Sequence, residues 1–513
     1  MWGVSRPWGD VTSCDPPQPN RGHRRGRRSA QRIRGACAER GKRGALSEGG
    51  PTLGGDGGRG VAAWGWTVNV IAWGDVEGPA VPGYGLGVAQ RLGGVTAELG
   101  IRDGRAVLGW RNATGKALKG APAAVRRDHA GEVTRLRTAV RDIDRTLAAQ
   151  AGRLDRQFTE RRALPYAHWR RGLADHPLLG TLARRLLWTV DGVACGWAEG
   201  GLRALDGEPV PVAGGRAVVL WHPLGRERAE INAWREWLER HGVTQPFRQA
   251  HREVYGPADA ARLFATPHVL RQHPFAALAA ARGWRYRPSP PGEDALPHAT
   301  RELPQWGLRA ELRIQGVDGD EGGDCPGGPA LIGTDQVRFL PLDAPASGSR
   351  ACRLPPADVP PLVLSEVLRD VDLFVGAAGI GNDPTWQDGG PDGRFRAYWA
   401  SCVSGELTPC AATRREVVSR LVPRLAIAGR CAVEGRFLRV RGDRHTYRIH
   451  LGSGNVLMSP DDRHLCVVPP ATAGAVPGPL PFEGDPMLPV ILAKALLLAR
   501  DTEITDPTIV SRL

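Results

Sequence analysis

Lysine is scarce in this 513-residue chain, and nearly every basic residue is an arginine. The lysines are Lys42, Lys116, Lys119 and Lys494. The formal net charge is nevertheless +14, and half of it lies in residues 1–50, which hold eleven Lys and Arg against four Asp and Glu. A strongly basic chain points to nucleic acid as a partner. Arginine together with abundant Ala, Gly and Pro is instead typical of a GC-rich genome, so a nucleic-acid partner is not favoured.

The sequence also lacks the spacings that define metal and nucleophile motifs. Its nine cysteines include no pair at CxxC spacing, and neither H-E-x-x-H nor G-x-S-x-G occurs. His268 and His273, like His445 and His450, are five residues apart, a spacing that does not build a zinc site on a helix or a strand. The sequence therefore predicts no metal site, names no cofactor, and leaves open whether the protein is an enzyme.

Long apolar runs are missing too. The longest, Leu488–Ala499, is interrupted by Pro489 and Lys494, and it is shorter than the roughly 20 residues of a membrane-spanning helix. The N-terminus has charge but no apolar core of a secretory signal. Scattered cysteines, odd in number, favour reduced thiols. We therefore predict a cytoplasmic protein without a membrane segment.

Composition and the positions of turn and linker residues divide the chain into four parts. Residues 1–90, rich in Gly, Arg, Pro and Trp, show neither helical nor strand period and are predicted to be disordered. A nucleic-acid-binding arm and a start codon placed too far upstream remain alternatives for this part. We predict a helix-rich α+β domain over 91–287, a mixed α/β region over 288–428, and a β-meander with a helix over 429–513.

Periodicity supports an α+β fold with a helix-rich front, short strands, and a C-terminal meander and helix, rather than a doubly wound sheet. Val95–Asn112 alternates around Asp103-Gly104, which predicts a hairpin. Apolar residues from Val133 to Phe158 recur at three and four, which predicts a long helix. The region 128–162 is also the candidate surface for a protein partner. Further helices are expected over Leu178–Val190, Glu227–His241, Thr244–Trp284, Leu354–Asp370 and Thr413–Leu425, and strands over Ala217–Trp221, Leu308–Gln315, Gln336–Leu342 and within Arg436–Val468.

The stretch DLFVGAAGIGNDPTW, Asp372–Trp386, reads as an apolar strand that enters a glycine-rich turn. Gly376 and Gly381 have the separation of a phosphate-binding loop, but Asn382 and Asp383 stand where that loop needs Lys and Ser or Thr. Gly379 gives GxxGxG rather than GxGxxG, and no long helix can follow. We interpret the loop as structural, with glycines at positive φ, and keep an anion or nucleotide site as the alternative.

The segment TQPFRQAHREVY, Thr244–Tyr255, is predicted to be a helix capped by Thr244. Phe247, Ala250 and Val254 would form its buried stripe. A second stripe, Arg248, His251, Arg252 and Tyr255, offers paired donors to an anion, with a titratable group between two cations. These four residues are our candidate anion-binding surface. A face whose arginines pair with carboxylates of the same chain is the alternative.

Several long stretches together resemble one family. They include WRNATGKALKGAPAAV (Trp110–Val125), DHPLLGTLARRLLWT (Asp175–Thr189), TQPFRQAHREVY and YRIHLGSGNVLMSPDDRHLCVVP (Tyr447–Pro469). The chain resembles the C-terminal part of the domain of unknown function 4132 (DUF4132) family, which includes proteins named as molybdate metabolism regulators. The resemblance covers roughly residues 95–513. The activity of the family is not established, so the resemblance implies no catalytic residues.

Two hypotheses follow for function. The first is a cytoplasmic regulatory or interaction protein. The second is an enzyme that acts on a nucleotide or another phosphorylated ligand, with its site built from the Arg248–Tyr255 stripe and the Gly376–Asp383 loop. Convergence of those two segments on one pocket would favour the second hypothesis. Arginines paired with internal carboxylates would favour the first.

Overall fold

The computed structural model describes residues 88–102, 104–160, 162–264, 267–288, 297–317, 331–344, 352–382, 395–465, 467 and 480–513. All of them belong to one unit, Val68–Leu513. Most of the segment 1–90 lies outside these residues. Order was expected from near Val95, whereas strand β1 begins at Val88.

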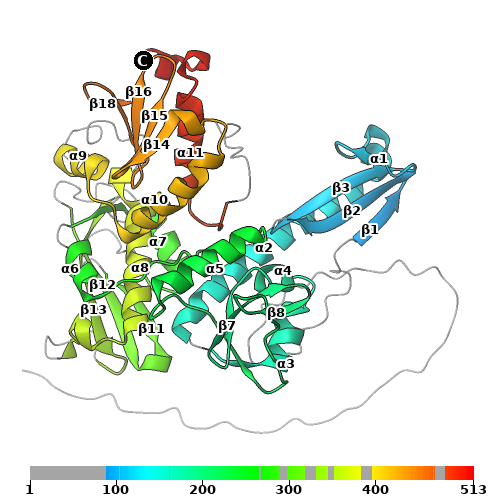
Figure 1. The fold of residues 1–513 in the computed structure, drawn as a ribbon, viewed down its shortest axis with the longest axis horizontal. Coiled ribbons are helices and arrows are strands. Elements are labelled where there is room, and N and C mark those ends of the chain that lie inside the picture. The colour runs from blue at the N-terminus through cyan, green and yellow to red at the C-terminus, as the bar shows by residue number, and fades with distance from the viewer. Residues whose placement is uncertain are drawn as a thin grey trace, which may run out of the picture. The chain divides into compact units, whose positions relative to one another are not determined.

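The predicted hairpin opens the described chain. β2 (Val95–Arg102) pairs antiparallel with β3 (Arg105–Asn112) in the register expected for a turn at Asp103-Gly104. β1 (Val88–Leu92) and β4 (Ala117–Leu118) complete a sheet of order β1-β2-β3-β4. After α1 (Ala123–Asp128), α2 (Ala130–Glu160) confirms the predicted long helix, which lies against β3 and α8 (Pro361–Ala378) (Figure 1).

A second sheet has the order β5-β9-β6-β7-β8. Its strands are β5 (Leu164–Pro165), β6 (Trp188–Val190), β7 (Val193–Ala198), β8 (Gly201–Arg203) and β9 (Ala217–Leu220). The helical elements of this part are α3 (Tyr166–Trp169), η1 (Arg170–Ala174), α4 (Gly180–Ala183) and α5 (Arg228–Arg240). The strand β9 and the helix α5 match the prediction. The prediction of a helix over Leu178–Val190 was wrong, because only α4 is helical in this stretch and Trp188–Val190 joins the sheet.

A third sheet, β10-β13-β12-β11, includes strands from both sides of the predicted boundary at residue 288. They are β10 (Val269–Arg271), β11 (Ala299–Leu303), β12 (Leu308–Gln315) and β13 (Leu331–Pro341). The neighbouring helices are α6 (Pro257–Leu263) and α7 (Gln272–Ala281), with the short η2 (Pro304–Trp306) and η4 (Pro356–Asp358). The domain boundaries stay predictions.

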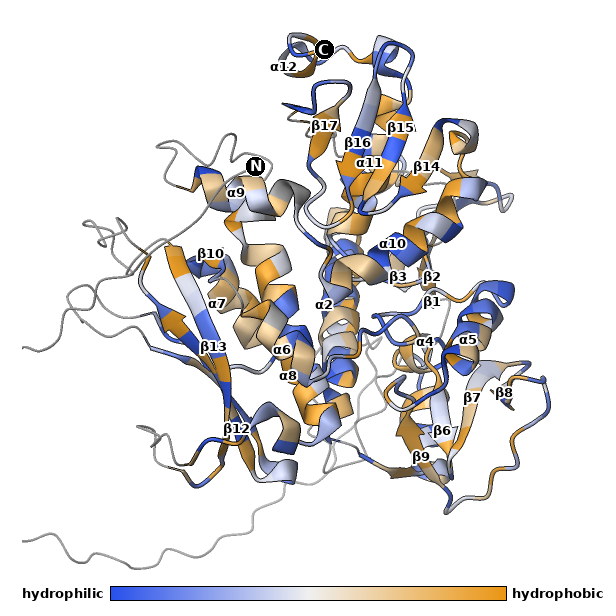
Figure 2. Cartoon of the chain, turned by 60° about the vertical axis from the view of Figure 1, so that its left-hand side comes forward, coloured by the Kyte–Doolittle hydropathy of each residue, from blue (hydrophilic) through white to orange (hydrophobic). Residues whose placement is uncertain are grey.

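The helix α8 lies at the centre of this arrangement. It packs against α2, α6, α7 and α10 (Pro409–Leu421) (Figures 1 and 2). Pro361 occupies its first turn, where a missing N–H costs nothing. The prediction of a strand at Asp372–Val375 was wrong. Val367, Val371, Phe374 and Ala378 are spaced by four, three and four, so the apolar run continues a buried helix up to Ala378.

The C-terminal part confirms the predicted meander and helix. Its sheet runs β14-β15-β16-β17-β18, and the inward residues Tyr447, Ile449 and Leu451 are buried. Asp485 accepts hydrogen bonds from the Met487 and Leu488 N–H groups at the start of α11. The strands are β14 (Cys431–Glu434), β15 (Phe437–Arg441), β16 (Thr446–His450), β17 (Val456–Met458) and β18 (Arg463–Leu465). The helical elements are η5 (Ile380–Asn382), α9 (Arg396–Ser404), η7 (Val422–Arg424), η8 (Ala428–Arg430), α11 (Met487–Leu498), η10 (Asp501–Glu503) and α12 (Pro507–Val510).

The fold class is therefore α+β, as predicted, with antiparallel sheets and helices packed around α8. No helix formed by the described residues combines the length and apolar character needed to cross a membrane.

Candidate functional site

The segment 244–255, which carries the predicted anion-binding residues, is not a helix. Thr244 does not cap it, because its hydroxyl donates to the Leu480 carbonyl. Phe247 and Ala250 are buried as expected, but Val254 is 42% exposed and does not belong to a buried stripe. Arg248, His251, Arg252 and Tyr255 are buried, so they do not form an exposed face.

Glutamine side chains explain why this segment is not a helix but an irregular chain, with bends over Pro246–Gln249 and a turn at Ala250–His251. The Gln249 amide donates to the carbonyls of Leu187 and Trp221 and accepts from the Leu187 N–H, so the side chain replaces a strand partner. Gln245 exchanges main-chain hydrogen bonds with the segment that holds Phe482. These bonds join residues far apart in the sequence, and they outweigh the local helical pattern.

Arg252 is paired with two carboxylates of the same chain. Its Nη1 lies 2.6 Å from Asp155 Oδ1 in α2, and its Nε lies 2.7 Å from Glu366 Oε1 in α8. A second bond, from Nη2 to the other Glu366 oxygen, makes the latter pair bidentate. Burial alone would raise the pKa of Glu366, but Arg252 and His222 outweigh burial and hold that pKa well below its usual range. Arg252 and Glu366 are therefore both charged.

Arg248 connects the same segment to the C-terminal part. Its guanidinium pairs with Glu253 and with Asp485, which in turn accepts from Arg414 Nε at 2.9 Å. Burial would raise the pKa of Asp485, and Arg248 with Arg414 lowers it instead. The internal carboxylate partners expected by the structural alternative are thus present for both arginines.

These pairs belong to a continuous buried ion network. Glu253 also bonds Arg369 at 2.9 Å, Asp155 pairs with Arg282, and Asp370 lies 2.7 Å from Arg282 and 2.6 Å from Arg301. Its cations are Arg248, Arg252, Arg282, Arg301, Arg369 and Arg414, and its anions are Asp155, Glu253, Glu366, Asp370 and Asp485. The positive and negative charges of the network nearly balance, and its ion pairs hold α2, α8, α10 and the 244–255 segment together.

Tyr255 and His251 have different surroundings. The Tyr255 hydroxyl donates to Asp372 Oδ2 at 2.5 Å, and burial raises the pKa of Tyr255 and that of Asp372. Burial, followed by Arg235, Arg420 and Arg248, lowers the pKa of His251 well below its usual value, so its imidazole is neutral near pH 7. The buried His251 Nδ1 has no hydrogen-bond partner among the described residues, and the ring borders a small cavity of about 60 Å³.

Part of the candidate stripe and the candidate glycines meet in one cavity of about 340 Å³, here called the junction pocket. Arg248 and Tyr255 line it, and so do Gly376, Gly379 and Gly381. His251 and Arg252 lie outside its lining, and so does Asn382, which belongs to η5. Whether any of these residues binds an anion stays a prediction.

Burial favours the neutral forms of His450, Cys402 and Cys410, which line the junction pocket. His450 Nδ1 accepts from the Ser453 N–H and its Nε2 donates to the Gly405 carbonyl, while burial lowers the pKa of His450 to about 4. Burial raises the pKa of the Cys410 thiol to about 12 and also raises the pKa of Cys402. Neutral thiols are poor nucleophiles. Among the described residues, no group of three or more His, Cys, Asp or Glu side chains is placed to hold a metal ion.

The three candidate glycines do not have the backbone conformation that was predicted for them. None of Gly376, Gly379 and Gly381 has a positive φ, so the expectation of left-handed positions was wrong. A β-carbon at Gly381 would lie 2.3 Å from Cys402 Sγ, so close packing requires glycine there. A β-carbon on the helical Gly376 would meet nothing within 4 Å and would point into open space.

We therefore expect Gly376→Ala and Gly381→Ala to change stability in opposite directions. Gly376→Ala should raise the free energy of unfolding by up to about 1 kcal/mol, the helix-propensity difference. Gly381→Ala should lower it by about 1 kcal/mol or more through overpacking against Cys402. Urea midpoints decide the matter, and a loss of stability in Gly376→Ala would contradict the structure.

Sequence reasoning missed the acidic members of the site. Asp155, Glu366, Asp372 and Asp485 come from three separated parts of the chain. Asp155, Glu366 and Asp372 lie on helices, where charged residues usually face solvent. One signal was available: Glu366, Arg369 and Asp370 interrupt an otherwise apolar, buried helix at spacings of three and four, which indicates a polar partner in the interior.

These features define an α+β protein whose interior contains a buried ion network, with the junction pocket beside it. Residues 115–284 match the family model described as Domain of unknown function (DUF4132), so the chain carries a DUF4132 domain and the resemblance predicted from the sequence is confirmed there. Residues 411–513 match a second model, described as Domain of unknown function (DUF7737). No curated protein and no solved structure matches the chain.

Proposed function

We propose that the protein is a regulatory protein that binds a small neutral or positively charged molecule in the junction pocket. The observation that carries this proposal is the origin of the pocket walls. Arg248 and Tyr255 come from the region that matches DUF4132, whereas Arg414, His450 and Asp485 come from the region that matches DUF7737. A bound molecule would contact both regions and could alter how firmly they are joined.

The charge of the lining supports this class of ligand. The arginines of the pocket, Arg248 and Arg414, already share Asp485. The acidic side chains in the lining outnumber the arginines; they are Asp259, Asp372, Glu406 and Asp485. A phosphate would meet these carboxyl groups without gaining a guanidinium that is not already paired, whereas an amine or a hydroxyl would find acceptors.

The protonation states of the ionisable groups in the junction pocket support binding rather than catalysis. General-base and nucleophilic catalysis need groups whose pKa lies near neutral pH or whose charged form is stabilised. The raised pKa of Cys410 and the lowered pKa of His450 are the opposite of that requirement.

A thermal-shift screen with matched variants tests the proposal. The probes are agmatine, spermidine and adenosine as cationic or neutral molecules, and ATP, NAD⁺ and molybdate as anions. Gly376→Leu should fill the pocket, because the added side chain starts in open space. Gly131→Leu is the control, since Gly131 is also helical with open space at its β-carbon but lies outside the pocket.

We expect at least one cationic or neutral probe to raise the melting temperature of the parent and of Gly131→Leu, but not of Gly376→Leu. A ligand at about 100 times its Kd adds about 2.7 kcal/mol to the stability, which is readily measured. Shifts that persist in Gly376→Leu, or an absence of shifts with every cationic and neutral probe, would contradict the proposal.

An enzyme that acts on a nucleotide or phosphorylated ligand is the second candidate. It is favoured by one observation, the convergence of Arg248, Tyr255 and the glycines on one pocket. The same screen separates the two candidates, because the enzyme predicts shifts with ATP or NAD⁺ that Gly376→Leu abolishes.

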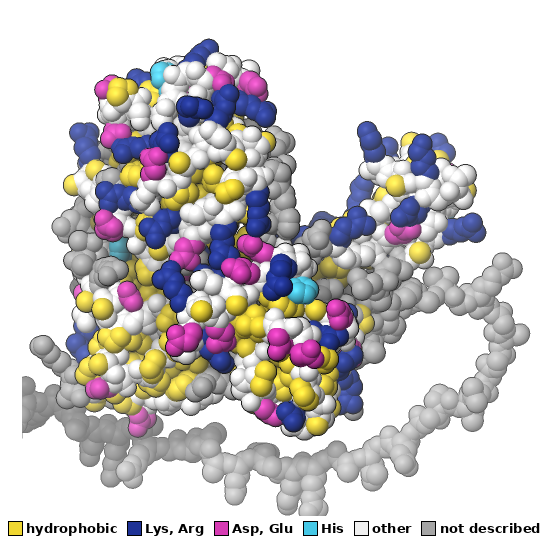
Figure 3. All heavy atoms as spheres, viewed as in Figure 1, with side chains coloured by type: hydrophobic (Ala, Val, Ile, Leu, Met, Phe, Trp, Pro, Cys, Tyr) yellow, Lys and Arg dark blue, Asp and Glu magenta, His cyan; other side chains and the backbone are white. Residues whose placement is uncertain are grey.

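The remaining proposals concern partners and location. The apolar stripe of α2 packs within this chain, so a protein partner of the 128–162 region would have to bind its polar faces. On the face shown in Figure 3, Lys and Arg side chains are interspersed with Asp and Glu side chains, which supports a protein partner over nucleic acid. The described cysteines, among them the buried Cys195 and Cys410, are unpaired, which supports a cytoplasmic location.

A further inference from the structure

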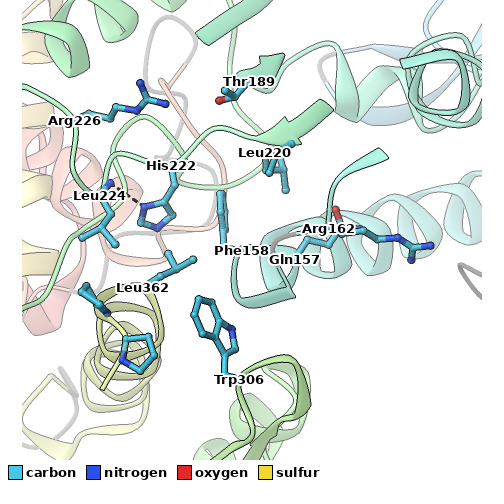
Figure 4. Close-up of a pocket in the computed structure, with 13 residues that line it drawn as sticks. Gln157, Phe158, Arg162, Thr189, Leu220, His222, Leu224, Arg226, Trp306 and Leu362 are labelled. Carbon is cyan, nitrogen blue, oxygen red and sulfur yellow. Dashed lines mark hydrogen bonds between the residues drawn. The ribbon is translucent and has the colours of Figure 1, made fainter. Parts of the chain in front are cut away.

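A second cavity, of about 490 Å³, lies where the end of α2, the loop after β9, η2 and the first turn of α8 meet (Figure 4). Its walls are mainly apolar and include Phe158, Leu220, Trp306 and Leu362. The volume lies within the range of small-molecule sites, which are typically apolar with a few placed polar groups. We call it the α2 cavity.

The aromatic walls of the α2 cavity are fixed from behind. The guanidinium of Arg252 lies 4.1 Å from the centre of the Phe158 ring, so the buried ion network supports this wall. The Trp306 indole N–H donates to the Thr159 carbonyl at 2.6 Å. His222 accepts from the Leu224 N–H at its Nδ1 and faces Glu366 with its Nε2 at 3.1 Å. The cavity is therefore preformed, and a ligand would not need to order its walls.

One polar group in the lining lacks a partner. Gln157 is 6% exposed, and its amide Nε2 is buried without a hydrogen-bond partner among the described residues. A buried donor without a partner is costly, and such groups usually bond water or a ligand. Gln157 lines the α2 cavity, so a ligand there can supply the acceptor.

The charged residues of the lining have one sign. Arg162 and Arg226 belong to it, and no Asp or Glu is among the described residues that line the cavity. The Arg226 guanidinium lies 3.6 Å from Glu230, outside the lining. The sign is opposite to that of the junction pocket, whose lining contains more carboxyl groups than arginines.

From these observations, we propose that the α2 cavity is a separate small-molecule site for an amphipathic anion, with a flat apolar body and a carboxylate or sulfonate end. The body would lie between Phe158, Trp306 and Leu362. The anionic end would accept from the Gln157 amide and lie in the positive field of Arg162 and Arg226. This inference does not depend on the function proposed for the junction pocket.

The test uses 8-anilinonaphthalene-1-sulfonate as a fluorescent aromatic anion, and its displacement by indole-3-acetate or by the uncharged indole-3-acetamide. The variants are Leu362→Trp, which fills the cavity, and Gln157→Leu, which removes the amide donor. Val193→Trp is the control, because Val193 is 50% exposed and lies outside the lining.

We expect the parent and Val193→Trp to bind one equivalent of the probe and to bind indole-3-acetate at least tenfold more tightly than indole-3-acetamide. Leu362→Trp should lose binding. Gln157→Leu should bind indole-3-acetate at least tenfold more weakly, while its urea midpoint stays equal to that of the parent or rises, since an unpartnered amide is replaced by an apolar group. This combination separates a lost contact from a damaged fold.

Equal affinity for indole-3-acetate and indole-3-acetamide would overturn the proposal. Unchanged binding in Leu362→Trp would do so as well, because the probe would then lie elsewhere. Absence of binding to the parent would also overturn it.

Discussion

Replacing Arg252 with Ala lowers the free energy of unfolding by about 3 kcal/mol or more, which is the expected cost of removing one partner from a buried ion pair. Glu366 loses its bidentate partner, and the ion pairs that Asp155 keeps among the described residues are those with Arg282 and, at 4.0 Å, Arg369. Both carboxylates would remain charged in a buried site. Urea unfolding followed by tryptophan fluorescence measures the loss.

Two variants control this experiment. Arg127→Ala removes an exposed pair with Asp128 and should change stability by less than about 0.5 kcal/mol. Adding Glu366→Gln to Arg252→Ala should recover part of the loss, because it neutralises one of the unpaired charges. An Arg252→Ala protein as stable as the parent would show that this arginine is not part of a structural network.

Lowering the pH is expected to destabilise the protein already at pH values well above those at which carboxylates titrate. Burial lowers the pKa of His450 to about 4, helped by Arg436 and Arg414 and opposed by its bond to Gly405 and by Glu406. Because this pKa lies below that of an unfolded histidine, about 6.5, the unfolded state binds more protons between the two values. The contribution of His450 is therefore complete above pH 6.5 and is lost as the pH falls toward 4.

The size of this loss of stability follows from the width of the pH interval between the unfolded and folded pKa values of His450. Between pH 6.5 and pH 5, His450 alone should contribute a loss of about 2 kcal/mol. The pKa values of His222, His251 and His268 are also lowered, mainly by burial, and act in the same direction. The raised pKa of Asp372 acts in the opposite direction.

Urea midpoints measured from pH 7.5 to pH 5 in the parent and in His450→Gln test this expectation. The variant should show a pH dependence that is smaller by about 2 kcal/mol over that window, whatever its stability at pH 7.5. Parallel pH profiles would mean that His450 is not neutral in the folded protein.

Local patterns predicted much of the fold. The hairpin of β2 and β3, the helix α2 and the meander from β15 to β18 follow from alternation, from spacings of three and four, and from turn residues. Each of these elements has its main partners nearby in the sequence or a single apolar face. The pattern therefore specifies both the element and its buried side.

Long-range contacts explain the errors. The 244–255 segment has a helical pattern, but Gln249 bonds Leu187 and Trp221 and holds the segment in an irregular, non-helical conformation. Asp372 was assigned to a strand because the glycines after it resemble a turn, whereas the buried stripe of α8 passes through this point.

The candidate site was predicted only in part. Arg248, His251, Arg252 and Tyr255 were identified by residue type and spacing, and the structure shows them buried. Glu253 lies only five residues from Arg248, but the other acidic partners could not be inferred, since Asp155, Glu366 and Asp485 are separated from the arginines by about a hundred residues or more. Only the packing of α2, α8 and the C-terminal part brings these carboxylates to the arginines.

The central claim is that Arg248 joins the DUF4132 and DUF7737 regions through Asp485, and that it is not a free anion-binding residue. A double-mutant cycle with Arg248→Met and Asp485→Asn, measured by urea unfolding, tests it most directly. Asn keeps a side-chain oxygen that can cap α11. The predicted result is a coupling of about 2 kcal/mol, so that the double variant loses clearly less stability than the sum of the single variants. Additive losses within about 0.5 kcal/mol would contradict the claim.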